Sequence, residues 1–349
     1  MDRARADYHE DRKASSVAAR RPIVSVMNRR RLLLTGATGF AGRALHPALV
    51  AAGGRVRCLT RDAARARRRH PGHDWVEGNV ADREAVARAL DGCDAAFYLV
   101  HSMREGGDYR RRDRDAARAF ADAAAAAGVE RIVYLGGVAP AAGGASEHLQ
   151  SRLEVGETLR AGAVPTLELR ASMIIGYGSL SWLTVRDLAA RLPVMVLPRW
   201  LGSRTQPVAI DDVVVALTRA LEVPLDASAA FDVPGPQTLS GRQILEETAR
   251  QLGRPLPFMI EVPLLTPRLS ALWVRLVTRA NWNVAREIVV GLEHDLLARD
   301  DRYWTLIDHT RRLGFAEAAR RALAEERAPA RGPWGAVERV LPRVDPRGT

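Results

Sequence analysis

The feature that most constrains this chain is a glycine-rich turn near its N-terminal end. Gly36, Gly39 and Gly42 are spaced three residues apart, after a short apolar run at 32–34 and before an apolar-patterned segment at 40–52. A strand that enters a tight turn and continues as a helix presents free backbone N–H groups and the positive end of the helix dipole. The pattern predicts a phosphate-binding turn. Its alternative is a glycine turn with a structural role only.

Apolar runs and amphipathic segments alternate after this turn. Such alternation predicts a parallel sheet with right-handed crossovers. The expected fold class is therefore α/β, a Rossmann-type doubly wound parallel sheet with a smaller, mainly helical C-terminal lobe. Strands are expected at 55–60, 74–77, 95–100, 131–135 and 166–170, the last of the series, and helices at 82–90, 113–127, 147–161 and 240–252.

The expected domain boundaries follow composition and pattern. Residues 1–28 are polar and aperiodic, which predicts a disordered basic tail, and translation starts at Met1 or at Met27. A nucleotide-binding domain is expected over 29–255, with a substrate lobe continuing from about 171, then a helical lobe over 256–326 and a flexible tail over 327–349. The apolar stripe at 264–280 predicts a helix used as core or dimer contact, or alternatively at a membrane surface.

The end of the second expected strand bears on the choice of cofactor. Enzymes that use NAD place an acidic residue there for the ribose 2′-hydroxyl, whereas this chain has Arg61 followed by Asp62. A guanidinium makes charge-assisted hydrogen bonds to a 2′-phosphate. NADP(H) is the preferred cofactor, and NAD(H) remains possible through Asp62.

Charge and residue usage limit the classes of function. The formal net charge is +11, but residues 1–31 contain nine basic and four acidic residues, and no aromatic residues alternate with the basic clusters. A solvated basic surface is expected rather than a nucleic-acid site. The chain has two cysteines, and Lys13 is its only lysine. We expect no disulfide framework, no metal site, no transmembrane segment and no lysine chemistry in the folded body. A cytoplasmic location, a small-molecule substrate and a possible homodimer are expected.

Several segments together resemble the atypical and extended short-chain dehydrogenase/reductase superfamily. They are TGATGFAG at 35–42, CLTRD at 58–62, GNVAD at 78–82, YLVHSM at 98–103 and RIVYLGG at 131–137. The resemblance is to bacterial NAD(P)-binding, sugar-epimerase-like members, with nitrogen-repression regulators as more distant relatives. It implies that the phosphate turn holds the pyrophosphate, that Arg61 meets the 2′-phosphate, that Asn79 and Val80 flank the adenine, and that Val100, His101 and Ser102 approach the ribose and nicotinamide. The implied turn residues are Gly36, Ala37, Thr38, Gly39, Phe40 and Gly42.

The catalytic positions depart from that family. Its active members use a serine after the fifth strand and a Tyr-x-x-x-Lys pair on the next helix, and these positions hold Gly136-Gly137, His148 and Arg152 here. Carbonyl reduction by the usual triad is therefore excluded.

Three other side chains are candidates for chemistry. His148 and Arg152 are four residues apart and share a helix face. His148 can act as general acid or base, with a pKa that a nearby arginine lowers, and Arg152 can act as a ribose ligand and fixed charge. The alternative is a polar helix surface or ribose anchors without proton transfer. Tyr177 is a further candidate proton donor. His70, His73, His294 and His309 are expected at the surface.

The sequence thus predicts an NADP(H)-dependent oxidoreductase that transfers hydride to a small carbonyl, enone or quinone-like substrate. A non-catalytic NADP(H)-sensing regulator and, with less support, a nucleotide-sugar epimerase-like enzyme are the alternatives.

Overall fold

The computed structural model describes residues 27, 29–100, 108–140, 144–191, 194–198, 202–256, 258–262 and 294–327. The expected helix at 264–280, His101, Ser102 and most of the two expected tails lie outside the described residues.

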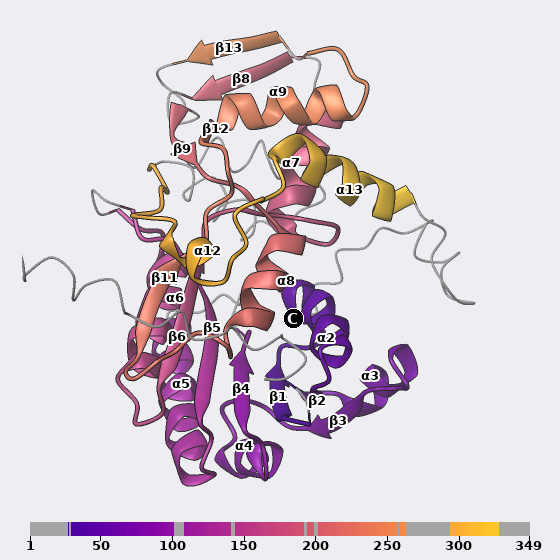
Figure 1. Ribbon diagram of the computed structural model, residues 1–349. Helices are drawn as coiled ribbons and strands as arrows, with labels where there is room; N and C mark the ends of the chain where they lie inside the picture. Colours follow the sequence, from indigo (N-terminus) through magenta and orange to yellow (C-terminus); the bar gives the residue numbers. More distant parts are fainter. Residues whose placement is uncertain are drawn as a thin grey trace, which may run out of the picture.

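Seven parallel strands form the main sheet, in the order β11-β6-β5-β4-β1-β2-β3 (Figure 1). The strands are four to seven residues long, and the central ones are buried along nearly their whole length, as expected for strands covered on both faces. Their bounds are β1 Arg31–Thr35, β2 Arg55–Thr60, β3 Asp74–Glu77, β4 Ala95–Tyr98, β5 Arg131–Gly137, β6 Thr166–Ala171 and β11 Ala229–Asp232. The order reverses between β1 and β4, and ligands of doubly wound sheets bind at the carboxyl edge of such a switch point. There the Thr35 hydroxyl donates to Phe97 O (3.1 Å) and accepts from Leu99 N (3.0 Å).

Helices cover both faces of the sheet. Among the described residues, four helices pack with the sheet in one hydrophobic core and three in another on the opposite face. The first set is α2 Phe40–Ala51, α3 Ala63–Arg69, α8 Ile210–Arg219 and α12 Arg302–Leu306, and the second is α4 Arg83–Leu90, α5 Tyr109–Ala126 and α6 Glu147–Arg160.

A second lobe lies beyond the carboxyl edge of the sheet (Figure 1). Its own core joins Trp182, Ile244 and Phe315 from three helices, α7 Leu180–Arg191, α9 Gly241–Gln251 and α13 Phe315–Arg327. Short strand pairs complete it: β7 Ile174–Ile175 with β10 Val208–Ala209, β9 Arg204–Thr205 with β12 Leu239–Ser240, and β8 Val194–Pro198 with β13 Phe258–Val262.

The C-terminal segment is fastened to this framework by buried polar contacts. Asp212 on α8 pairs with His309 Nε2 (2.7 Å) and accepts from Leu313 N (2.9 Å). The Trp304 indole donates to Pro234 O (3.0 Å), and the Tyr303 hydroxyl donates to Ala216 O (2.8 Å). The last described part of the chain is therefore integral to the nucleotide-binding fold.

Three local expectations need correction. The arginine cluster of Arg65 and Arg67–Arg69, which we expect from the sequence to lie in a surface connection, belongs to a helix, α3 Ala63–Arg69. The helix forms because Asp62 caps its N-terminus and its small residues Ala63 and Ala66 face the core. The strand series does not end at β6, since β11 adds a further parallel strand beside it. The expected helical lobe also contains a strand, β13, which pairs with β8.

Candidate cofactor and active site

The glycine turn has the close-packed geometry that a phosphate-binding loop requires. Gly36 adopts φ +68°, which L side chains rarely tolerate, and a Cβ there would lie 2.5 Å from Leu99 O. A Cβ on Gly42 would lie 2.2 Å from Gly36 O. The turn is closed by a hydrogen bond from Gly39 N to Gly36 O (2.9 Å). A side chain at Gly36 or Gly42 would therefore displace the backbone, so these glycines permit the tight shape of the turn.

The helix that follows the turn begins without a side-chain cap. Gly39 occupies the N-cap position of α2, and no acidic residue lies in the first turn. By contrast, Asp62, Asp82, Ser146 and Ser240 cap α3, α4, α6 and α9. The free N–H groups and the dipole of α2 are thus directed to the carboxyl edge of the sheet, where they attract an anion.

The other expected cofactor residues lie at the same edge. The Val100 Cγ1 atom lies 3.3 Å from where a Gly36 Cβ would stand. Arg61 follows β2 and is exposed, whereas the Asp62 carboxylate is engaged with Arg65 N at 2.8 Å. Asn79 and Val80 follow β3, with Asn79 exposed and Val80 packed partly against the core.

The end of β5 has no room for the usual serine. A Cβ on Gly136 would lie 2.6 Å from Glu168 Oε1, and one on Gly137 would lie 2.6 Å from Leu149 Cδ1. Glu168 is fully buried and ion-paired with Arg160 (2.8 Å) and Arg170 (3.1 Å). The carboxylate therefore needs the space beside Gly136, and this contact explains a glycine there.

His148 and Arg152 lie on α6 next to this strand end. The Arg152 guanidinium donates through Nη2 to Gly136 O (2.8 Å) and Leu135 O (3.2 Å), and its Nε is a buried donor without a hydrogen-bond partner among the described residues. Burial, and secondly the charge of Arg152, lowers the pKa of His148 to about 4. At neutral pH the site therefore holds a neutral imidazole beside a fixed cation.

Tyr177 lies in a loop that packs on the first turn of α2. A Cβ on Gly176 would lie 3.0 Å from Phe40 Cζ, and one on Gly178 would lie 2.9 Å from Arg43 Nη2. The Tyr177 side chain is 40% exposed. The loop that carries Tyr177 thus lies next to the start of α2, and Arg43 lies close to this loop.

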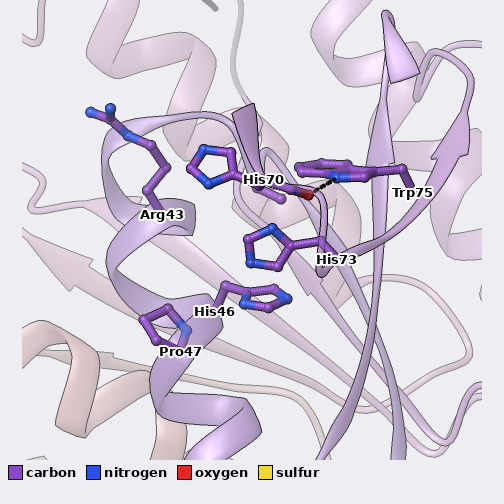
Figure 2. A pocket seen from close by; sticks show the side chains of 7 residues that line it. Arg43, His46, Pro47, His70, His73 and Trp75 are labelled. Carbon is purple, nitrogen blue, oxygen red and sulfur yellow. Dashed lines mark hydrogen bonds between the residues drawn. The ribbon is translucent and has the colours of Figure 1, made fainter. Parts of the chain in front are cut away.

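One feature was missed at the sequence level, a cavity of about 220 Å³ beside the turn. Ala37, Arg43, Pro47, Trp75 and three histidines line it, and Figure 2 shows the imidazoles of His46, His70 and His73 grouped together. We name these three residues the histidine cluster. His70 and His73 are therefore not simple surface residues, and neither is His309, which pairs with buried Asp212. Positions so far apart along the chain give no periodic signal.

Within the described residues, no group of three His, Cys, Asp or Glu side chains is arranged to hold a metal ion. None of the helices described there combines the length and apolar character needed to cross a bilayer.

Comparisons with known proteins agree with this geometry. Residues 36–186 match a family described as NAD(P)H-binding. The chain is 33% identical over 236 residues to (4-alkanoyl-5-oxo-2,5-dihydrofuran-3-yl)methyl phosphate reductase of Streptomyces griseus, an alignment that covers 65% of this chain and 76% of that protein. It is 31% identical over 205 residues to ceramide reductase of Caulobacter vibrioides, covering 55% and 61% of the two proteins.

Solved structures share the fold at lower identity. Triphenylmethane reductase of Citrobacter sp. superposes with a TM-score of 0.67 at 15% identity, covering 84% of this chain and 99% of that one. An NADPH-dependent quinone oxidoreductase of Escherichia coli gives 0.64 at 18% identity, covering 82% and 98%. With the glycine turn, the parallel sheet and these matches in agreement, the chain belongs to the NAD(P)H-binding, atypical short-chain dehydrogenase/reductase family.

Proposed function

We propose that this protein is an NADP(H)-dependent reductase of conjugated acceptors, such as enones, unsaturated lactones or quinones. The observation that carries the proposal is the Arg152 guanidinium, fixed at the end of β5 by two carbonyl groups and accompanied by a neutral His148. The phosphate turn and Arg61 would hold the cofactor, and the cofactor when bound supplies the hydride.

The protonation state of the site favours a conjugated acceptor over a simple ketone. Reduction of a simple ketone generates an alkoxide, a strong base that needs a proton donor as it forms. An imidazole with a pKa of about 4 is not protonated at neutral pH, and the family's tyrosine is absent. An enolate or hydroquinone anion is a much weaker base, which a fixed cation stabilises until water protonates it. Arg152 is proposed as that cation and His148 as its neutral hydrogen-bonding neighbour.

One curated relative and one structural neighbour have names that are compatible with this substrate class. One is named for reducing a dihydrofuran that bears oxo and alkanoyl groups, and a structural neighbour is named as a quinone oxidoreductase. A preference for NADPH is proposed because Arg61 is exposed at the end of β2, whereas the Asp62 carboxylate already caps α3.

The test measures NADPH oxidation with a quinone, a cyclic enone and the matching saturated ketone. We expect turnover of the conjugated acceptors at least about 100-fold above the ketone. Arg152→Gln should lower kcat by about 100-fold, as removal of an oxyanion-stabilising donor does. Arg152→Lys, which keeps the charge, should lose less, and His148→Ala should also reduce turnover.

Cofactor preference is measured separately with Arg61→Ala. This variant should lose at least about 10-fold in NADPH affinity and keep its NADH affinity. If the protein binds NADPH tightly but turns over no acceptor, a sensing role replaces this proposal. The missing Tyr/Lys pair is the observation that favours such a role.

A further inference from the structure

The histidine cluster adjoins the phosphate turn directly. Ala37 belongs to the turn and also lines the cavity, while Arg43 and His46 reach it from α2 (Figure 2). His70 is the C-cap residue of α3, and Trp75 lies on β3, where its indole donates to His70 O at 3.0 Å. The cavity is therefore bounded by the turn, α2 and the α3–β3 connection.

The three imidazoles lie close to one another. The rings of His46 and His73 meet edge to face with centroids 3.5 Å apart, and those of His70 and His73 are 5.1 Å apart. His46 is only 9% exposed, whereas His70 and His73 are half-buried, and Nδ1 of His73 is buried without a hydrogen-bond partner among the described residues. A buried polar atom without a partner is costly unless a ligand or water satisfies it.

The charged groups that act on the cluster are all basic. Arg43 on α2 and Arg69 on α3 lower the pKa of His70 after burial, and the histidines lower one another's. The remaining charged groups nearby are engaged elsewhere, Arg67 with Trp75 O (2.9 Å) and Asp74 with Arg57 (3.5 Å). The neighbouring Cys58 thiol is buried, which raises its pKa. Arg43 also interacts with the carboxylate of Glu325 on α13 Phe315–Arg327. With Arg43 and Arg69 set against this one carboxylate, the surroundings of the cluster suit an anion.

We infer that the cavity binds a phosphoryl group, and that this group is the 2′-phosphate of NADP(H) held in the adjoining turn. The inference rests on the proposed use of NADP(H). With about 30 Å³ for one water, the 220 Å³ cavity has room for a phosphate. A bound dianion offsets the repulsion among the imidazoles, so at least one of them takes up a proton when NADPH binds.

Proton linkage gives this inference an unusual signature. The second pKa of a phosphate monoester is about 6, so a 2′-phosphate held by arginine alone loses charge and affinity as the pH falls. A site whose histidines take up protons on binding instead holds the 2′-phosphate more tightly as the pH falls. The selectivity for NADPH over NADH should therefore rise at least about 5-fold between about pH 8 and about pH 6.

Calorimetry in buffers of different ionisation enthalpy measures both affinity and proton uptake. We expect the protein to take up protons when it binds NADPH and none when it binds NADH. The triple variant His46→Gln/His70→Gln/His73→Gln should lose the proton uptake and the pH-dependent selectivity while still binding NADH. If this triple variant does not fold, His70→Gln alone should weaken the proton uptake and the pH-dependent selectivity. His294→Gln, which lies outside the cavity, is the matched control and should behave as the wild type.

The possible failures are distinguishable. If neither cofactor binds, the proposed function fails. If both bind, and proton uptake is equal for the two cofactors or survives the triple substitution, only the histidine inference fails. Inorganic phosphate should compete with NADPH, and phosphate binding that leaves NADPH affinity unchanged would overturn the assignment to the 2′-phosphate.

Discussion

At the scale of single residues, the absence of a side chain at Gly36 and Gly42 shapes the turn that we propose as the phosphate site. A Cβ on Gly42 would meet Gly36 O at 2.2 Å and the Ala37 Cα at 2.8 Å, and both contacts are with backbone. A flexible neighbour could turn away, but a backbone contact forces the turn itself to move. The glycine at this position therefore maintains the shape of the phosphate site.

We expect Gly42→Ala to weaken dinucleotide binding by at least about 30-fold, or about 2 kcal/mol. Gly72→Ala is the matched control, because nothing lies within 4 Å of its added methyl group. Titration calorimetry measures both, with thermal melting to check the fold. Affinity in Gly42→Ala equal to that in Gly72→Ala would contradict the assignment of the turn.

At the scale of elements, the site depends on a helix that begins without a cap. Asparagine at an N-cap stabilises a helix by about 1 kcal/mol relative to alanine and by a few tenths of that relative to glycine, because its side chain accepts from the first free N–H groups. Gly39 has φ −77°, which other residues adopt readily. Gly39→Asn should therefore leave the melting temperature unchanged or higher, and lower dinucleotide affinity at least about 10-fold by occupying the same donors.

For a capped helix that binds no ligand, removing the cap should lower stability and leave cofactor affinity unchanged. Ser240 and Gln243 form a reciprocal capping box at the start of α9. Ser240→Ala should lower the melting temperature and leave cofactor affinity unchanged. If both substitutions moved stability and affinity together, the free N-terminus of α2 would not be a binding element.

The elements that the sequence predicted well are those with a strong local signal. β2 and β3 were predicted at their observed bounds, and α2 to within one residue, because apolar runs and glycines mark them. α3 was missed because its four arginines outweigh its two small core residues, Ala63 and Ala66, in the hydrophobic pattern. β11 carries only four residues, and its place beside β6 depends on contacts between distant segments.

The features of the candidate site also divide into those with a local sequence signal and those that depend on tertiary packing. The pairing of His148 with Arg152 could be predicted from helical spacing, and the phosphate turn from its glycines. The close approach of Glu168 to Gly136 and the grouping of His46 with His73 could not, since they arise from tertiary packing between residues 27 or more positions apart.

At the scale of the whole molecule, the C-terminal segment is joined to the nucleotide-binding half through Asp212. This side chain is 4% exposed and satisfies both His309 and Leu313 N. Truncating it leaves a buried N–H and an imidazole unpaired, so Asp212→Ala should lower the free energy of unfolding by about 2–4 kcal/mol. Asp211→Ala removes the adjacent carboxylate, which pairs with Arg321 at the surface, and should cost at most about 1 kcal/mol. Urea denaturation distinguishes the two, and equal losses would show that Asp212 does not anchor the segment.

Acid should destabilise the whole fold through histidines that are kept neutral. Burial lowers the pKa values of His46 and His148 to about 4, and those of His70 and His73 also fall below 6.5. The unfolded chain therefore binds more protons, and stability that is intact above about pH 6.5 declines as the pH falls toward 4. Between about pH 7 and about pH 5, His46 alone should contribute about 1–2 kcal/mol to this loss in urea denaturation. His46→Gln should reduce the loss by that amount, because the substitution removes a group whose pKa rises on unfolding, while His294→Gln, at a histidine outside the cavity, is the control. A pH dependence that His46→Gln leaves unchanged would mean that the proton uptake occurs elsewhere in the molecule.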